Sequence, residues 1–372
     1  MVKILFLMDN ITEGGAEKVL RNLVNNMDQE QFQITVQTVE EADAKRYLVP
    51  GIRYKAINRC KSRIGKKLFH YWIRLCAEVN WVYPLYIKDD YDIEVAYLEC
   101  GPTKFLSGST NKNALKLAWV HCDLVQRGTT AAKKLLSTYS HYDKIVCVSN
   151  TVKTSFQSIF GTSPEAVVLH NVNDEADIQN KAAAFSVEHP KEFTFLFVGR
   201  LSYEKGGDRL LNACARLKDS GLVFRVSFVG DGDRREELES QVKSLGLQDH
   251  IRFHGFQSNP YPYIASADCI VCPSRYEGFS TVVTEALILG KPVIATPCSG
   301  MDELLGDSEY GIVTEDSTDS IAKAMQRIIF DPKLLFYYQV SALNRGRQFS
   351  KKSVIENTQQ FLLSELEQKR AK

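Results

Sequence analysis

The chain has 372 residues, of which 44% are hydrophobic and 24% charged, and its formal net charge is +1. This composition is typical of a soluble protein with two domains, and it argues against a nucleic-acid-binding protein, which carries a marked basic excess. No segment reaches eighteen apolar residues or has the order of a signal peptide, so we expect a cytosolic protein with no membrane span.

The nine cysteines are odd in number and scattered through apolar segments. Cys269 and Cys272 form a C-x-x-C pair, but no histidine or second pair stands at the spacing of a zinc site. We therefore expect reduced core cysteines and no metal centre.

Strand and helix patterns alternate from the first residues. Lys3 to Met8 is a short apolar strand, and apolar positions from Val19 to Met27 follow at helical spacing. Further strands are predicted over 34–39, 93–98, 115–120, 144–148 and 167–170. This alternation predicts an α/β protein whose parallel sheets are connected by crossover helices.

A polar break runs from Asn171 to Lys191, and a second strand and helix series begins at Phe193. We therefore expect two doubly wound, Rossmann-like domains with a ligand cleft between them. The predicted divisions are 1–175, a linker over 176–192, a second domain over 193–349, and a C-terminal helix over 350–372 that returns to the first domain. The charged tail after Glu367 is expected to fray.

A basic stretch, residues 45–76, contains no acidic residue. Its second part interleaves bases with aromatic and aliphatic side chains. Two interpretations stay open: a helix that lies on an anionic membrane surface, and a solvated helix whose apolar side packs on the first domain. The bases are Lys45, Arg46, Arg53, Lys55, Arg59, Lys61, Arg63, Lys66, Lys67 and Arg74.

The second domain opens with a strand that ends in a basic turn. The apolar strand reaches Val198, Gly199 and Arg200 follow it, and a helix begins near Asp208. Arg200 and Lys205 flank this turn, where a bidentate guanidinium and a compact ammonium suit a diphosphate.

Two glutamates eight positions apart, Glu277 and Glu285, flank a second turn. The turn lies between a buried strand, Cys269 to Cys272, and a helix predicted over Thr281 to Leu289, so Gly278, Phe279 and Ser280 stand where backbone N–H groups point outward. Such a helix start captures anions, and the glutamates can accept hydrogen bonds from sugar hydroxyls. The alternative is a loop carboxylate and a solvated helix residue, which the nearby basic turn makes less attractive.

Two further polar positions follow predicted strands. His121 stands at a strand end, where the alternatives are a ligand contact and a hydrogen-bonded structural histidine. Asp231 and Asp233 have the D-x-D spacing of some metal sites, but we expect Asp233 to cap a helix that starts at Arg234.

Together these motifs resemble the retaining glycosyltransferases of family four, which have the GT-B fold of two Rossmann-like domains facing a central cleft. The resemblance rests on Gly-Gly-Ala-Glu-Lys at 14–18, G-R-L-x-x-x-K-G at 199–206 and E-x7-E at 277–285. Within the family, the chain is most similar to bacterial enzymes that build capsule, exopolysaccharide or lipid-linked glycans. It has Val282 where many members have proline, which affects only the local loop.

The resemblance implies roles for the matching residues. Arg200 and Lys205 would neutralise the donor diphosphate, Glu277 would face the donor sugar, and Glu285 would hold the ribose. His121 would contact the transferred sugar, which completes a catalytic set of His121, Arg200, Lys205 and Glu277.

Backbone contacts to the donor are implied for a second group of residues, in which glycine allows close approach. This donor-binding group is Gly14, Gly15, Gly199, Gly278, Phe279 and Ser280.

The implied reaction transfers a sugar, with retention, from a nucleoside diphosphate such as UDP to a hydroxyl of a saccharide or lipid-linked acceptor. The first domain would bind the acceptor and the second the nucleotide sugar, which is a co-substrate; no metal or other cofactor is expected. The enzyme would work in the cytoplasm or at the inner face of the plasma membrane. A sugar-nucleotide epimerase and a non-catalytic partner subunit of another transferase remain alternatives.

Overall fold

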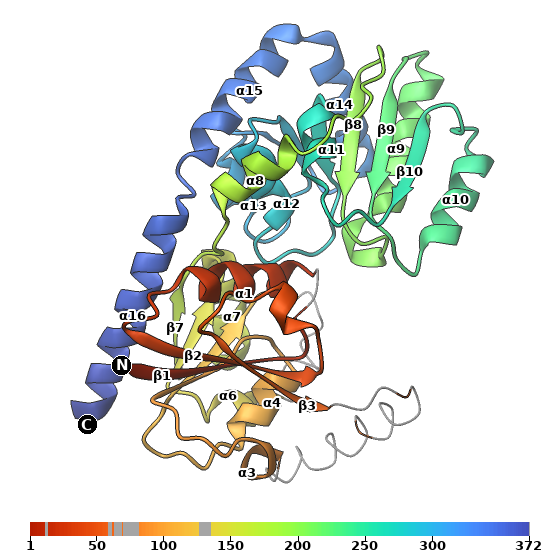
Figure 1. Ribbon diagram of the computed structural model, residues 1–372. Coiled ribbons are helices and arrows are strands. Elements are labelled where there is room, and N and C mark those ends of the chain that lie inside the picture. The colour runs from red at the N-terminus through yellow and green to blue at the C-terminus, as the bar shows by residue number, and fades with distance from the viewer. Residues whose placement is uncertain (12–13, 59–61, 63–68, 70–81, 126–134, 372) are drawn as a thin grey trace. The chain divides into compact units, whose positions relative to one another are not determined.

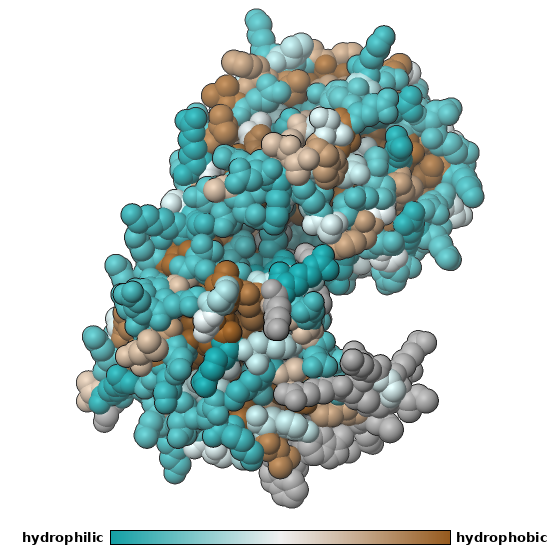
Figure 2. Space-filling model, in the orientation of Figure 1, coloured by the Kyte–Doolittle hydropathy of each residue, from teal (hydrophilic) through white to brown (hydrophobic). Residues whose placement is uncertain are grey.

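The computed structural model describes the chain except residues 12–13, 59–61, 63–68, 70–81, 126–134 and 372 (Figure 1). It divides into two compact units. The first unit consists of residues 1–172 and 352–372, and the second of residues 173–351. The surface in view in Figure 2 is mainly hydrophilic, with apolar residues confined to small areas.

The described part of the first unit holds a 7-stranded sheet of order β3-β2-β1-β4-β5-β6-β7, in which every pair of neighbours is parallel. Its strands are β1 Val2–Met8, β2 Phe32–Glu40, β3 Arg53–Asn58, β4 Ile93–Ala96, β5 Leu115–Val120, β6 Lys144–Cys147 and β7 Glu165–Val168. Its helices are α1 Gly15–Asn26, η1 Ala44–Arg46, α3 Val82–Tyr86, α4 Gly101–Ser107, α6 Leu136–Tyr139, α7 Asn150–Phe160 and α16 Lys351–Ala371.

The second unit holds a 6-stranded parallel sheet of order β10-β9-β8-β11-β12-β13. Its strands are β8 Thr194–Val198, β9 Arg225–Val229, β10 Ile251–Gly255, β11 Cys269–Cys272, β12 Val293–Ala295 and β13 Ile312–Val313. Its helices are α8 Glu175–Ala182, η2 Tyr203–Lys205, α9 Gly207–Asp219, α10 Arg235–Ser244, α11 Tyr261–Ser266, α12 Thr281–Ile288, α13 Met301–Leu305, α14 Thr318–Phe330 and α15 Pro332–Gly346.

Both sheets follow from the apolar strand patterns. Parallel strands need cover on both faces, and β11 and β12 are accordingly apolar and buried along their whole length. The core of the second unit gathers Phe195, Phe197, Val226 and Phe228 from β8 and β9 against the helices that include α9. The α/β fold class predicted from the sequence is confirmed.

Two segments differ from the expectations. The expected linker, 176–192, contains most of helix α8, which packs on α11 and α12 of the second unit. The charged tail after Glu367 is helical and not frayed as expected: α16 continues to Ala371. Its last turn is held to the first unit by Lys369, whose Nζ lies 2.7 Å from Asp143, and by Arg370, 2.5 Å from Asp92. No described helix is long and apolar enough to cross a bilayer.

Candidate functional site

The basic turn and the E-x7-E loop lie at the same edge of the second sheet. Strands β8 and β11 are parallel neighbours, so the loops that follow them leave the sheet at their shared carboxyl edge. The basic turn continues into η2 and α9, and the E-x7-E loop into α12. Ligands of open parallel α/β sheets bind at this edge.

Lys205 and Glu277 form an ion pair at this edge. Lys205 Nζ lies 2.7 Å from Glu277 Oε1, and Ser274 Oγ donates to the same oxygen over 2.7 Å. The side chain of Glu277 is 9% exposed and that of Lys205 24% exposed. Among the described residues, these hydrogen bonds all go to Oε1, so Oε2 can accept one from a ligand.

The pair keeps Lys205 charged. Burial alone would lower the pKa of Lys205, but the electrostatic interactions with Glu277 and Cys272 and the hydrogen bond that Lys205 donates to Glu277 outweigh burial and raise the pKa above its ordinary 10.5. Lys205 is therefore a cation throughout the neutral range, which a diphosphate site requires.

Arg200 supplies a second positive charge. It follows Gly199, whose backbone N–H donates to Val229 O over 3.0 Å, and its side chain is exposed. The positive charge of Arg200 lowers the pKa of Lys205, but this effect is smaller than the rise caused by Glu277. No described residue forms a salt bridge with Arg200, so its guanidinium is available to an anionic ligand.

Arg275 and Asp208 connect the two loops, which are far apart in sequence. Arg275 makes two hydrogen bonds to the Asp208 carboxylate, of 2.9 and 2.7 Å, and a third of 2.8 Å to Tyr203 O. Its backbone N–H donates to Glu204 O over 2.7 Å, and its guanidinium lies 4.2 Å from the centre of the Tyr203 ring. We call this the Arg275–Asp208 clamp.

The clamp is electrostatically satisfied. Burial would raise the pKa of Asp208, but the hydrogen bonds and charge of Arg275, with the charge of Arg234, hold that pKa below its ordinary value. Asp208 also lies in the first turn of α9, where its negative charge is favoured by the helix dipole.

Gly206 allows the two loops to touch. Its φ is +68°, a left-handed conformation, and an added Cβ would lie 2.1 Å from Pro273 O. Only glycine fits both the conformation and the contact. The backbone of the basic turn therefore packs directly on the loop that carries Glu277.

The loop before α12 is fixed by buried groups. Ser280 caps α12 by accepting from Val283 N over 3.5 Å, and Phe279 is 5% exposed, with its ring 6.3 Å from that of Phe349. Glu285 is 3% exposed, and Tyr261 Oη lies 3.4 Å from its carboxylate. Glu285 is thus a buried residue of α12, and the solvated alternative is wrong.

The remaining predicted residues belong to the first unit. Gly14 is the N-cap of α1 and Gly15 its first residue. His121 follows β5, where the buried Glu99 carboxylate accepts from the backbone N–H groups of His121 and Cys122. Glu99 thereby fixes the backbone that carries the histidine.

The His121 ring is held in a buried environment. Burial lowers the pKa of His121, despite the opposing charge of Glu99 and a hydrogen bond to the backbone of Tyr97. The imidazole is therefore neutral at neutral pH. Its Nε2 is buried, and no described residue donates to it or accepts from it. A buried polar atom without a partner is uncommon in native proteins, and this Nε2 can form a hydrogen bond with a ligand or a water molecule.

The aspartate pair does not behave as expected. Helix α10 starts at Arg235 with Arg234 as its N-cap residue, and no side chain caps it, so the predicted cap by Asp233 is wrong. Asp231 instead accepts from Gly232 N and lies 3.1 Å from Arg235. The described residues include no cluster of three histidine, cysteine or acidic side chains suited to a metal. Burial raises the pKa of the Cys269 and Cys272 thiols.

Half of the basic stretch lies outside the described residues. Apart from Ser62 and Phe69, residues 59–81 lie outside the described part of the chain. Near its start, Lys55 and Arg53 lie 2.7 and 3.4 Å from Asp89.

Sequence reasoning missed the residues that hold the site in place: Asp208, Arg275, Ser274, Tyr261 and Glu99. Asp208 and Arg275 flank the two turns that were singled out, and that adjacency is the one signal the sequence offered. Pairing them requires knowing that β8 and β11 are neighbours.

We expect substitution of the clamp to loosen the site. Arg275→Gln removes hydrogen bonds to a charged carboxylate, each worth about 1.5–3 kcal/mol, and should lower both the free energy of unfolding and the affinity for UDP. Chemical denaturation and calorimetric titration measure the two effects. Arg216→Gln, which breaks an exposed pair with Asp319, is the matched control and should change neither. Equal UDP affinity in Arg275→Gln and wild type would refute the role of the clamp.

The pH dependence of UDP binding should change when Glu277 is neutralised. In Glu277→Gln, the carboxylate that opposes the effect of burial is gone, so the pKa of Lys205 falls. As the pH rises, Lys205 of the variant therefore loses its charge at a lower pH than Lys205 of the wild type. The affinity of Glu277→Gln relative to wild type should therefore decrease from about pH 7 to about pH 9.5, and taking this ratio cancels the titration of the ligand. A ratio that is constant with pH would show that Glu277 does not sustain the charge.

Residues 179–341 match the family model described as glycosyl transferases group 1. The chain is 32% identical over 207 residues to N-acetylgalactosamine-N,N'-diacetylbacillosaminyl-diphospho-undecaprenol 4-alpha-N-acetylgalactosaminyltransferase of Campylobacter jejuni, a match that covers 55% of each chain. The chain thus spans little more than half the length of this relative. It is 26% identical over 356 residues to an uncharacterized glycosyltransferase of Haemophilus influenzae, covering 93% of this chain and 95% of the relative.

Solved structures share the fold at low sequence identity. The complex of HepE of Anabaena with UDP-glucose has a TM-score of 0.76 at 20% identity and covers 98% of this chain and 100% of that one. Sucrose-phosphate synthase of Thermosynechococcus elongatus has a TM-score of 0.78 at 18% identity, covering 98% and 99%. Residues 179–341 are thus similar to the glycosyl transferases group 1, and the two parallel-sheet units have the GT-B fold of the solved structures.

Proposed function

We propose that this protein is a retaining glycosyltransferase that moves a sugar from a nucleoside diphosphate, UDP in the first instance, to a hydroxyl of a saccharide or lipid-linked acceptor. The observation that carries the proposal is the cationic edge of the second unit, where the paired Lys205 and the open Arg200 lie beside the start of α9. These groups suit a diphosphate, and they lie within the residues that are similar to the glycosyl transferases group 1.

The choice of donor and acceptor draws on the relatives. The Campylobacter protein is named for a sugar transfer to a diphospho-undecaprenol carrier, and HepE was crystallised with UDP-glucose. A UDP-sugar and a lipid-linked or saccharide acceptor are therefore the substrates to test first, in the synthesis of a cell-surface glycan.

In this reaction the bond between the anomeric carbon and the phosphate oxygen breaks, and negative charge gathers on the leaving diphosphate. Arg200 and Lys205 stabilise that charge. The N-cap residue of α9 is Gly206, which has no side chain to cap the helix, so backbone N–H groups of its first turn can add donors. This is electrostatic stabilisation by groups that the fold has already oriented.

Glu277 has a binding role in this proposal. Its Oε1 holds Lys205 and Ser274, and its Oε2 accepts from a hydroxyl of the donor sugar. The acceptor oxygen attacks the anomeric carbon from the side of the leaving group, its proton passes to the departing phosphate, and the configuration is retained. No carboxylate nucleophile is needed, in contrast to the retaining glycosidases.

The other predicted residues keep their roles within the proposal. Backbone groups of Gly199 and of the Gly278–Ser280 turn contact the donor, and Gly14 and Gly15 allow close approach of the α1 start. Glu285 holds the ribose, and His121, neutral and with an unpartnered Nε2, contacts the transferred sugar. We propose no metal and no cofactor besides the nucleotide sugar.

Removal of either cation should slow turnover. We expect Arg200→Ala and Lys205→Ala to reduce sugar transfer by about 10²-fold or more, as for loss of one donor to a developing anion. The donor is first found by thermal stabilisation with a panel of nucleotide sugars, and transfer is then followed by mass spectrometry of the acceptor. His121→Phe, which keeps a ring at this buried position, should fold and lose activity.

The assay has internal controls. Arg216→Gln should transfer at the wild-type rate, and a chelator should leave the rate unchanged. Normal turnover in Lys205→Ala would contradict the proposal, and full loss of activity on chelation would contradict its metal independence. Conversion of the donor sugar to an epimer without any acceptor would indicate an epimerase instead.

We also propose that residues 45–76 bind an anionic membrane surface, which would bring the site to a lipid-linked acceptor. The protein should sediment with vesicles that contain phosphatidylglycerol and remain in solution with phosphatidylcholine alone, and salt should weaken the binding. Neutralising Lys66 and Lys67 should reduce the bound fraction. Absence of sedimentation with anionic vesicles at low salt would refute this part.

A further inference from the structure

Strands β9 and β10 have a pattern that is unusual for a parallel sheet. Val226, Phe228, Ile251 and Phe253 point to the core of the second unit, whereas the residues between them are polar. Parallel strands covered on both faces are apolar throughout, as β11 and β12 are. The polar residues therefore mark a second, polar face of these strands, whose side chains are partly or fully exposed: Arg225, Ser227, Arg252 and His254.

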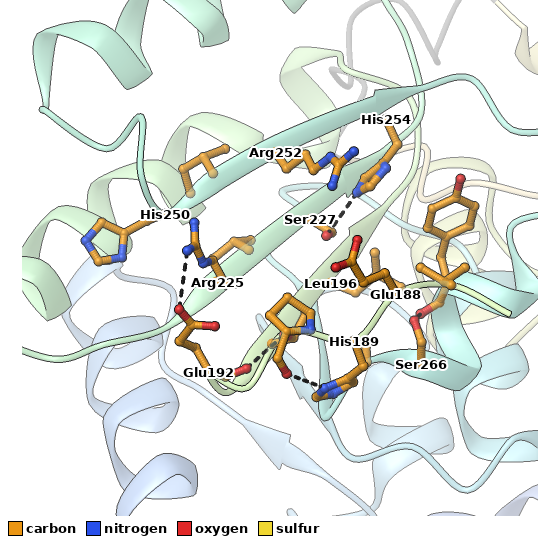
Figure 3. A pocket seen from close by; sticks show the side chains of 17 residues that line it. Glu188, His189, Glu192, Leu196, Arg225, Ser227, His250, Arg252, His254 and Ser266 are labelled. Atoms are coloured by element: carbon orange, nitrogen blue, oxygen red, sulfur yellow. Dashed lines mark hydrogen bonds and ion pairs between the residues drawn. The ribbon is translucent and has the colours of Figure 1, made fainter.

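This face forms the floor of a pocket of about 400 Å³ (Figure 3). Register places Leu196, Ser227 and Arg252 side by side on three adjacent strands. The walls come from residues 187–192, ahead of β8, and from Tyr263, Ser266 and Ala267 at the end of α11. The pocket shares no residue with the cationic edge that holds Arg200, Lys205 and Glu277.

Several polar groups of the pocket are already committed. Arg225 lies 3.3 Å from Glu192, which offsets its charge, and His189 lies 3.2 Å from Asp268. His254 Nε2 is 3.1 Å from Ser227 Oγ, and its ring lies 4.9 Å from that of Tyr263. Burial, and then the charge of Arg252, lowers the pKa of His254, so this imidazole is neutral at neutral pH.

Two charged groups are uncommitted. Neither Arg252 nor Glu188 forms a salt bridge or hydrogen bond with any described side chain, and both are pocket residues. Figure 3 shows Arg252 and Glu188 on either side of Ser227, with His254 beside Arg252. The pocket thus presents an open cation, an open carboxylate, a hydroxyl and aromatic rings.

We propose that this pocket is a second carbohydrate site, one that binds a saccharide carrying a carboxylate, such as a uronic acid residue. Arg252 pairs with the sugar carboxylate in a bidentate contact, and Glu188 and Ser227 hydrogen-bond the ring hydroxyls. The Tyr263 and His254 rings provide a surface for the apolar face of a pyranose. The inference does not depend on the proposed transferase activity, although a glycan-building enzyme could use such a site to retain its acidic product.

The test is calorimetric titration of the full chain with three probes. The first is a hyaluronan tetrasaccharide, which alternates glucuronate with N-acetylglucosamine; the second is chitotetraose, its neutral counterpart; the third is sodium sulfate. The tetrasaccharide should bind, chitotetraose should bind at least about tenfold more weakly, and sulfate should not displace the tetrasaccharide.

Variants locate the binding. Arg252→Gln should weaken tetrasaccharide binding at least about tenfold, and Glu188→Gln should weaken it severalfold. Arg347→Gln, an exposed arginine at the end of α15, is the matched control and should bind normally. UDP affinity should be unchanged in Arg252→Gln, so failure of UDP binding would count against the proposed function and not against this pocket.

Each other outcome overturns the inference. If chitotetraose bound as tightly as the tetrasaccharide, the pocket would not recognise the carboxylate. If sulfate displaced the tetrasaccharide, the pocket would be a general anion site. Normal binding by Arg252→Gln would place the saccharide elsewhere, and no binding of the tetrasaccharide at millimolar concentration would remove the site altogether.

Discussion

The candidate donor site depends on the partly buried ion pair between Lys205 and Glu277. Burial lowers the pKa of a lysine in this position, and Glu277, at a separation of 2.7 Å, more than offsets that effect. The two residues come from loops that follow neighbouring strands, so the pair forms only when those two loops keep their positions relative to each other. The Arg275–Asp208 clamp and the close packing of Gly206 on Pro273 hold the two loops in these positions.

This arrangement suits the proposed diphosphate site, because the charges are compensated also when the site is empty. Unpaired cations at close range would repel each other and shift their pKa values, whereas here one cation is neutralised by Glu277 and the other, Arg200, is exposed to water. In the proposed function, a diphosphate would meet the full charge of Arg200 and part of the charge of Lys205. Because the protein groups are already oriented, binding requires little reorganisation.

Local sequence patterns predicted much of this site. The strand at Cys269 to Cys272 was placed at its observed bounds, the helix over Thr281 to Leu289 differs by one residue, and the basic turn opens a helix beside Asp208 as expected. These features follow from short-range periodicity and from glycine, which a single sequence displays. The errors were also local: Asp233 fails as a cap because α10 begins at Arg235, and the charged tail stays helical because Lys369 and Arg370 find acidic partners in the first unit.

Tertiary partners could not be predicted. Arg275 and Asp208 are 67 residues apart, as are many unrelated pairs, and only the order of the strands brings them together. For the same reason, the sequence could not predict that Glu99 holds the backbone next to His121 or that Tyr261 lies beside Glu285. The polar face of β9 and β10 is different, because alternating polarity in a parallel strand is visible in the sequence. This face was not identified from the sequence.

The central claim is that Lys205 binds the second phosphate of the nucleotide. It is tested most directly by measuring the affinities of UDP and UMP for the wild type and for Lys205→Ala. The account predicts that the wild type prefers UDP by about tenfold or more, as a charge-assisted contact implies, and that this preference largely disappears in the variant. An unchanged preference in Lys205→Ala would contradict it.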